Sequence, residues 1–119
     1  MRSLVAAGMV MVLAMAAGAA LAGDKNPGPD IVIGTAGDDV LRGGNGPDLI
    51  RGLGGNDSIW GNKAPDVLRG GPGNDSIHGF GSGNAPDTLI GGPGKDRCIG
   101  TKGDTFRGCE FIKVRKGLG

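Results

Sequence analysis

The stretch GGNGPDLIRGLGGNDSIW, residues 43–60, contains one nine-residue unit twice. Each copy closes with an aspartate and three further residues, DLIR in the first copy and DSIW in the second, and a branched aliphatic lies two residues after the aspartate. The copies differ before the aspartate, where the first has Pro47 and the second has Asn56. The stretch therefore raises the question of whether two kinds of turn alternate along the chain.

The unit repeats along most of the sequence. From Lys25 to Ile99 the chain divides into eight rows of nine residues, with three additional residues, 79–81, after the sixth row. The sixth position is aspartate in every row: Asp30, Asp39, Asp48, Asp57, Asp66, Asp75, Asp87 and Asp96. The eighth position is apolar in every row: Val32, Leu41, Ile50, Ile59, Leu68, Ile77, Leu89 and Cys98. A disordered low-complexity chain would not keep such a register, so the pattern indicates a repeat architecture.

Each row predicts a short strand joined to a turn. Three residues such as 49–51 form a strand whose middle side chain points inward and whose neighbours point outward. The preceding six residues are rich in Gly, Asn and Asp, which tolerate the positive φ of tight turns. With 27 glycines, one Trp and no Tyr, the chain cannot be held together by large buried side chains alone, and its glycines lack the three-residue period of collagen.

Stacked turns of this kind require a cation. Stacking brings the carboxylates of successive turns together, and like charges in contact repel each other. A hard divalent cation that takes six to eight carboxylate and carbonyl oxygens would remove this repulsion, and these preferences are those of Ca²⁺. The row thus predicts calcium sites that involve the eight aspartates.

The rows resemble the GGxGxDxUx nonapeptide of the RTX, or haemolysin-type, calcium-binding repeats. This resemblance implies an all-β fold, a parallel β-roll or calcium-stapled β-solenoid, here of about eight nonapeptide half-turns with a C-terminal cap. It also implies that two rows make a full turn and that calcium lies between turns two rows apart. Many family members carry the repeats as the tail of a toxin, protease or lipase, but we expect no such activity here, because residues 1–119 hold only the repeats, a signal-peptide pattern and a short C-terminal segment.

The residue before the aspartate differs between odd-numbered and even-numbered rows, as a coil with two sides requires. One set of rows has Pro before the aspartate and the other has Asp38, Asn56, Asn74 or Lys95. Within each set the aspartates are spaced by 18, 18 and 21 residues, so the structural period is 18.

We expect stronger calcium sites on the Asn side than on the Pro side. The Asn-side sites lie between Asp39 and Asp57, between Asp57 and Asp75, and, with Lys95 adjacent, between Asp75 and Asp96. The Pro-side pairs are Asp30 with Asp48, Asp48 with Asp66, and Asp66 with Asp87. On the Pro side Ala64 and Ala85 replace the fourth-position glycine. If that position needs a left-handed backbone, alanine costs roughly 1 kcal/mol there; a purely structural role for the Pro-side turns is the alternative.

The N-terminal residues 1–22 have the pattern of a secretory signal peptide. Arg2 precedes an apolar run, and Ala20-Leu21-Ala22 forms a small-x-small cleavage site. A membrane anchor is the alternative, since the run is nearly long enough to span. Removal of Arg2 reduces the 13 Lys and Arg to 12, equal to the 12 Asp and Glu, so net charge gives no indication of a nucleic acid or membrane partner.

The register ends after Ile99, and residues 100–119 predict a C-terminal cap with a basic tail. Cys98 and Cys109 are the two cysteines of an exported chain, which favours a disulfide that fastens the cap to the last row. The alternative is a free Cys98 that fills the inward apolar position.

The remaining polar residues indicate no catalytic site. Trp60 and the single histidine, His78, are 18 residues apart at the outward ninth position, so their rings should lie side by side through ordinary cross-strand packing. Arg51 and Arg69 should neighbour each other in the same way, as a solvated basic strip. We therefore expect no enzyme.

The sequence predicts a secreted, extracellular calcium-binding β-roll, residues 23–99, whose folding is coupled to Ca²⁺. Its expected role is a structural or adhesive module, and the alternative is a folding or binding partner, in trans, of a secreted enzyme or toxin. Apart from calcium ions, the sequence predicts no specific partner, and no membrane span remains after signal cleavage.

Overall fold

The structure is a computed structural model that describes residues 5–6, 9–13, 20–22, 29–79 and 85–115, with side chains from residue 29 onward. All of its regular elements are β-strands. One sheet, here called sheet A, consists of β1 (Val5–Ala6), β2 (Met9–Leu13), β4 (Asp30–Ile33), β6 (Leu49–Arg51), β8 (Val67–Arg69), β10 (Thr88–Ile90) and β12 (Thr105–Arg107). The second, sheet B, consists of β3 (Ala20–Ala22), β5 (Val40–Gly44), β7 (Ser58–Asn62), β9 (Ser76–His78), β11 (Arg97–Thr101) and β13 (Phe111–Arg115).

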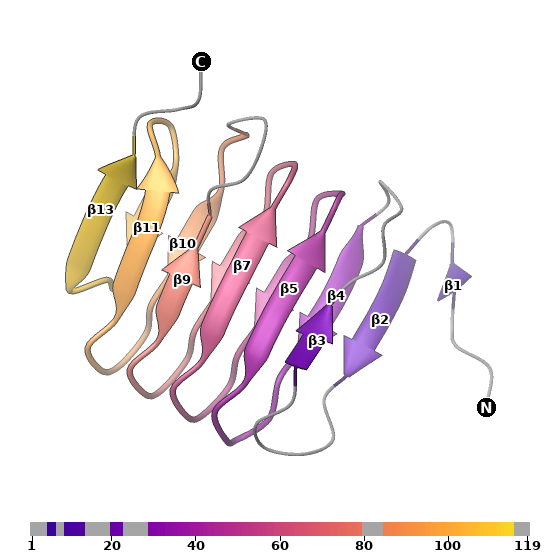
Figure 1. The fold of residues 1–119 in the computed structure, drawn as a ribbon, viewed down its shortest axis with the longest axis horizontal. Coiled ribbons are helices and arrows are strands. Elements are labelled where there is room, and N and C mark those ends of the chain that lie inside the picture. The colour runs from indigo at the N-terminus through magenta and orange to yellow at the C-terminus, as the bar shows by residue number, and fades with distance from the viewer. Residues whose placement is uncertain (1–4, 7–8, 14–19, 23–28, 80–84, 116–119) are drawn as a thin grey trace.

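The chain alternates between the two sheets and so winds as a coil. From β4 onward each strand pairs in parallel with the strand two places along the chain, as β6 does with β8 and β7 with β9. The register joins residues 18 apart, Ile50 to Leu68 and Ile59 to Ile77, which is the period found in the sequence. Figure 1 shows the strands of sheet B side by side, with sheet A behind them. The predicted all-β parallel β-solenoid is confirmed, with about four turns.

The core is one column of small apolar side chains between the sheets. All eight residues at the eighth position of the rows, from Val32 to Cys98, have no exposed surface. Burial of each Val, Leu or Ile contributes about 1.5–3 kcal/mol. Phe106 and Cys109 pack against the end of this column. This confirms the prediction that the middle side chain of each three-residue strand points inward.

The N-terminal segment extends both sheets in the uncut chain. β2 pairs in parallel with β4, and β3 pairs in parallel with β5. The rest of the predicted signal peptide, and the residues just after its cleavage site, lie outside the described residues. In the described part of the chain, no helix has the length and apolar character needed to cross a membrane.

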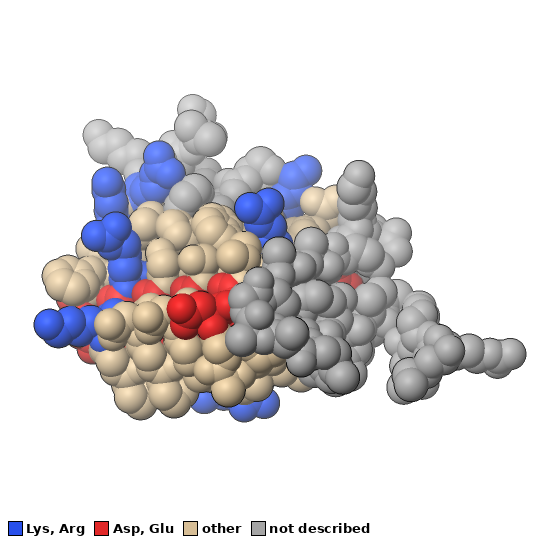
Figure 2. All heavy atoms as spheres, turned by 60° about the horizontal axis from the view of Figure 1, so that its bottom comes forward, with Lys and Arg blue, Asp and Glu red and all other residues tan. Residues whose placement is uncertain are grey.

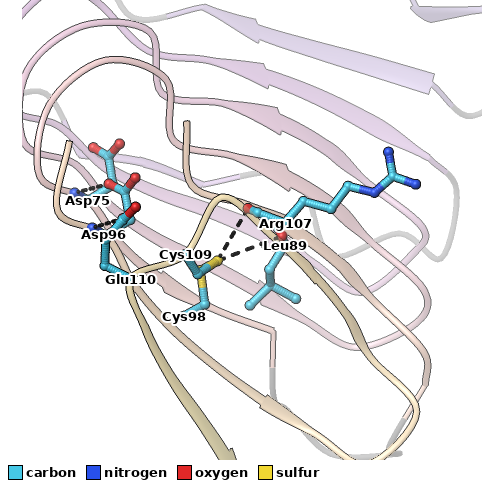
Figure 3. Close-up of a disulfide and its surroundings, with 7 residues drawn as sticks. All are labelled: Asp75, Leu89, Asp96, Cys98, Arg107, Cys109 and Glu110. Atoms are coloured by element: carbon cyan, nitrogen blue, oxygen red, sulfur yellow. Dashed lines mark hydrogen bonds between the residues drawn. A yellow bond between two sulfur atoms is a disulfide. The ribbon is translucent and has the colours of Figure 1, made fainter. Parts of the chain in front are cut away.

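The predicted cap adds a last strand to each sheet. β12 pairs in parallel with β10, and β13 pairs in parallel with β11. The disulfide between Cys98 and Cys109 is present, so the predicted pairing is confirmed (Figure 3). It links β11 to the segment between β12 and β13 and fastens both last strands to the preceding turn.

Candidate metal sites

The eight repeated aspartates form two buried ladders, one along each edge of the roll. Their side chains are at most 4% exposed. Along each ladder the backbone N–H of one aspartate donates to Oδ1 of the aspartate one coil later. On one edge Asp39 donates to Asp57, Asp57 to Asp75, and Asp75 to Asp96, at 2.8–2.9 Å. On the other edge Asp30 donates to Asp48, Asp48 to Asp66, and Asp66 to Asp87, at 2.8–2.9 Å.

The second carboxylate oxygen faces the turn of its own row. A Cβ placed on Gly61 would lie 2.5 Å from Oδ2 of Asp66, so the first-position glycine makes room for the carboxylate. In the first row of sheet B the N–H of Thr35 donates to Oδ2 of Asp39 at 2.6 Å. In four later rows the corresponding oxygen is buried without a hydrogen-bond partner among the described residues: Oδ2 of Asp57, Asp66, Asp75 and Asp96.

Burial and mutual repulsion disfavour the charged form of these carboxylates. Burial first, and then the neighbouring carboxylates, raise the pKa of Asp57 and Asp75 to about 7. The same causes raise the pKa of Asp66 to about 8 and that of Asp87 to about 7. The pKa of Asp96 is also raised, mainly by burial and further by Glu110. At neutral pH the ladders therefore hold either protons or a compensating cation.

The donor set fits calcium. Among the described residues no three His, Cys, Asp or Glu side chains gather as a compact metal cluster. A metal held here must take carboxylate oxygens together with backbone carbonyls of the glycine turns, and an all-oxygen set of this kind suits Ca²⁺ rather than Zn²⁺. An unpaired buried acceptor costs about 1–3 kcal/mol. A cation beside Oδ2 would remove both this cost and the repulsion along the ladder.

The two edges differ in the residue before the aspartate, which answers the question raised by Pro47 and Asn56. On the Asn edge, Asn56 N–H donates to Asp38 Oδ1, and Asn74 N–H donates to Asn56 Oδ1, at 2.7 and 2.8 Å. Lys95 N–H continues the series by donating to Asn74 Oδ1 at 2.9 Å. Proline has no N–H, so the Pro edge cannot form this second ladder. Figure 2 shows acidic side chains in a line along one edge of the roll.

The turns require left-handed backbone at the second and fourth positions of several rows. Gly55, Gly73 and Gly94 have φ of 84°, 115° and 113° at the fourth position. Ala64 has a φ of 69° at the same position, so its backbone is left-handed and the cost predicted for alanine applies to it. Ala85 directly follows residues that lie outside the described part of the chain, so for Ala85 the cost of a left-handed backbone stays a prediction.

Two acidic residues that we did not include in the predicted site terminate the ladders. Asp87 N–H donates to Asp104 Oδ1 at 2.8 Å, and Asp96 N–H donates to Glu110 Oε1 at 2.9 Å. Figure 3 shows Glu110 next to Asp96 and Asp75 at this end of the roll. The Gly-Asp pair 103–104 keeps part of the repeat pattern in the sequence, whereas nothing in the pattern marks Glu110.

The outward side chains that are 18 residues apart in the sequence also lie side by side, as predicted. The Trp60 and His78 rings stack with centroids 4.9 Å apart and an interplanar angle of 5°. Arg42 lies over the Trp60 ring, with its Cζ 5.2 Å from the ring centroid. His78 Nε2 is 3.0 Å from Ser76 Oγ, and burial lowers the pKa of His78. On sheet A, Arg51 is paired in register with Arg69.

A family model for the RTX calcium-binding nonapeptide repeat matches the chain four times, at residues 26–59, 42–77, 60–84 and 82–106. Searches of curated proteins and of solved structures found no match to the chain. The matches extend over more than half of the sequence and coincide with the coils that carry the aspartate ladders. The chain therefore belongs to the RTX calcium-binding repeat family and binds Ca²⁺ through a β-roll of this type.

Proposed function

We propose that this protein is a secreted calcium-binding module whose folding is coupled to Ca²⁺. The observation that carries the proposal is the pair of buried aspartate ladders, in which Oδ2 of Asp57, Asp66, Asp75 and Asp96 is buried without a partner among the described residues. Such an array is unfavourable without a cation, and its oxygen cage does not exist in the unfolded chain. Metal binding and folding are therefore one event.

The ligands we propose are the eight ladder aspartates together with carbonyls of the intervening turns. We rank the sites of the Asn edge, along Asp39, Asp57, Asp75 and Asp96, above those of the Pro edge, along Asp30, Asp48, Asp66 and Asp87. Two observations support this order. The side-chain ladder through Asn56 and Asn74 orders the Asn-edge turns. On the Pro edge, Ala64 holds a left-handed backbone that disfavours alanine.

Export is supported by two features at opposite ends of the chain. Residues 1–22 have the signal-peptide pattern, which we propose is cleaved after Ala22. The disulfide between Cys98 and Cys109 is of the kind that persists in oxidising compartments. We propose that the module acts extracellularly in a structural or adhesive role and carries no catalytic function of its own.

Circular dichroism of the protein without residues 1–22, recorded during a calcium titration, tests the coupling. We expect β-structure to appear with Ca²⁺ and not with the same concentrations of Mg²⁺, because Mg²⁺ demands a smaller octahedral site and dehydrates reluctantly. A spectrum that did not respond to calcium would refute the proposal.

Paired substitutions test the ranking of the two edges. Asparagine keeps Oδ1 as an acceptor for the coil-to-coil hydrogen bond and removes the charge that binds the metal. We expect Asp57→Asn with Asp75→Asn to weaken calcium binding more than Asp48→Asn with Asp66→Asn, measured by isothermal titration calorimetry. Equal losses in the two double variants would contradict the ranking.

A further inference from the structure

The charges of this protein are segregated between its inside and its outside. Of the described acidic residues, the eight ladder aspartates are buried, Asp104 is half-buried, and Asp38 and Glu110 are exposed. By contrast, every described basic residue is exposed: Arg42, Arg51, Lys63, Arg69, Lys95, Arg97, Lys102, Arg107, Lys113 and Arg115. When Ca²⁺ balances the ladders, the outer surface is strongly cationic although the formal net charge of the chain is +1. The near-neutral net charge of the chain therefore does not describe the charge of the surface that a partner would contact.

The outer face of sheet A concentrates this charge in one column. Its ninth-position residues are, in register, Ile33, Arg51, Arg69, Ile90 and Arg107. Its seventh-position residues, Ile31, Leu49, Val67, Thr88 and Thr105, form an uncharged column beside it. Between β4 and β12 the face carries no described acidic side chain.

A shallow hollow lies along this column. It has a volume of about 270 Å³ and is lined by Arg51, Arg69, Leu53, Pro72, Pro93 and Ile90, together with Gly71 and Gly92. Arg51 and Arg69 stand on adjacent strands, which are about 4.8 Å apart in a β-sheet. No ion pair or side-chain hydrogen bond joins either guanidinium to another described residue. Two neighbouring cations without a counter-charge repel each other, and a bound anion would remove that repulsion.

We propose that this groove binds a linear polysaccharide whose sugars carry carboxylates. The two guanidinium groups offer planar forks that match carboxylates in a bidentate manner. The leucine, isoleucine and proline side chains of the lining provide an apolar floor for the C–H face of a sugar ring. Because the strands repeat along the roll, Arg107 continues the cationic column beyond Ile90 and extends the surface in the direction of a polymer.

The composition of the groove favours a polysaccharide over a nucleic acid. Proteins that hold single strands combine basic residues with aromatic side chains on which bases stack. The lining of this groove contains no aromatic residue. The outward aromatic pair, Trp60 and His78, belongs to sheet B.

Fluorescence anisotropy with a labelled short oligogalacturonate tests the proposal. The calcium-loaded protein is used at a fixed free calcium concentration, and circular dichroism confirms that every variant is folded, so a failure of calcium-driven folding is separated from a failure of binding. We expect Arg51→Gln with Arg69→Gln to weaken binding at least about tenfold, because each lost charge-assisted pair is strong. The matched control, Arg97→Gln with Lys113→Gln, removes the same charge from sheet B and should bind like the unaltered protein.

A neutral oligosaccharide of equal length and a single-stranded oligothymidylate complete the design. We expect neither to bind as tightly as the oligogalacturonate. Equal weakening in the two double variants would reduce the interaction to general charge attraction and overturn the proposal. Oligothymidylate that bound as tightly as the oligogalacturonate, or folded protein that bound no oligogalacturonate, would overturn it as well.

Discussion

Ala64 shows how a single side chain affects the turns of the roll. Its φ of 69° lies in the left-handed region, where an L-residue with a Cβ is disfavoured by roughly 1–2 kcal/mol. We expect Ala64→Gly to raise the free energy of unfolding by about 1 kcal/mol, after allowance for the greater freedom of glycine in the unfolded chain. Urea denaturation at saturating calcium measures the change.

Ala36 provides the control, because it lies exposed in a turn whose residues are all described and is not among the residues with positive φ. Ala36→Gly relieves no left-handed strain and adds freedom to the unfolded chain, so we expect it to lower the free energy of unfolding by about 0.4–1 kcal/mol. The same gain in both variants would show that the backbone angle is not the cause.

The ladder carboxyls make the stability of the calcium-free protein depend on pH. The pKa of Asp57, Asp75 and Asp87 is about 7 and that of Asp66 about 8 in the folded chain, against 3.8 as the ordinary value. Above pH 3.8 the unfolded chain releases protons that the folded chain retains, so stability falls until the folded-state pKa values are passed. We expect calcium-stripped protein to be more structured near pH 5 than near pH 8, measured by circular dichroism.

The double variant Asp57→Asn with Asp75→Asn is the control for this pH dependence. It removes two of the titrating groups, so its calcium-free stability should change less with pH. A calcium-free protein that became more stable as the pH rose from about 5 to about 8 would contradict the raised pKa values.

At the scale of the elements, the cap strands β12 and β13 depend on the disulfide for their attachment to β11. Cys98 is fully buried in the core column and Cys109 is half-buried beside it. β13 also exposes Phe111, Ile112 and Val114 by 53–59%, so little apolar burial holds it in place.

Cys109→Ser removes the disulfide and leaves Cys98 in its apolar position. The bridge closes a loop with a sequence separation of 11, and we expect its loss to cost about 2–3 kcal/mol. Urea denaturation at saturating calcium measures this, and hydrogen exchange should show the loss of protection first in β12 and β13. Unchanged protection of these two strands would contradict their attachment by the disulfide.

At the scale of the whole molecule, the roll should form in one cooperative step. Each coil contacts its neighbours through parallel pairing and through the ladders, and the Trp60–His78 stack exists only when β7 and β9 are paired. We expect the fluorescence of Trp60, the single tryptophan, to follow the same calcium dependence as the circular dichroism signal. Separate midpoints would show that the coils fold independently.

The sequence by itself determined the coil, its period and its inward residues. Asp and an apolar residue at fixed positions of eight rows, with Pro and Asn alternating, leave one parallel two-sided arrangement that buries the eighth-position residue of every row. These features are local and periodic, so they can be read without coordinates. The pairing of Cys98 with Cys109 followed from the count of cysteines and their place in the pattern.

Tertiary structure decided what the pattern does not encode. Glu110 ends a ladder because β13 returns beside β11, and that return depends on the irregular chain after Ile99. Gly37 and Ala64 occupy the same position of their rows, yet Ala64 has a φ of 69° and Gly37 is not among the residues with positive φ, because the backbone of each turn is set by its own neighbours. The segregation of charge is likewise invisible in a net charge, because it arises when the coil turns its aspartates inward and leaves its arginines and lysines outside.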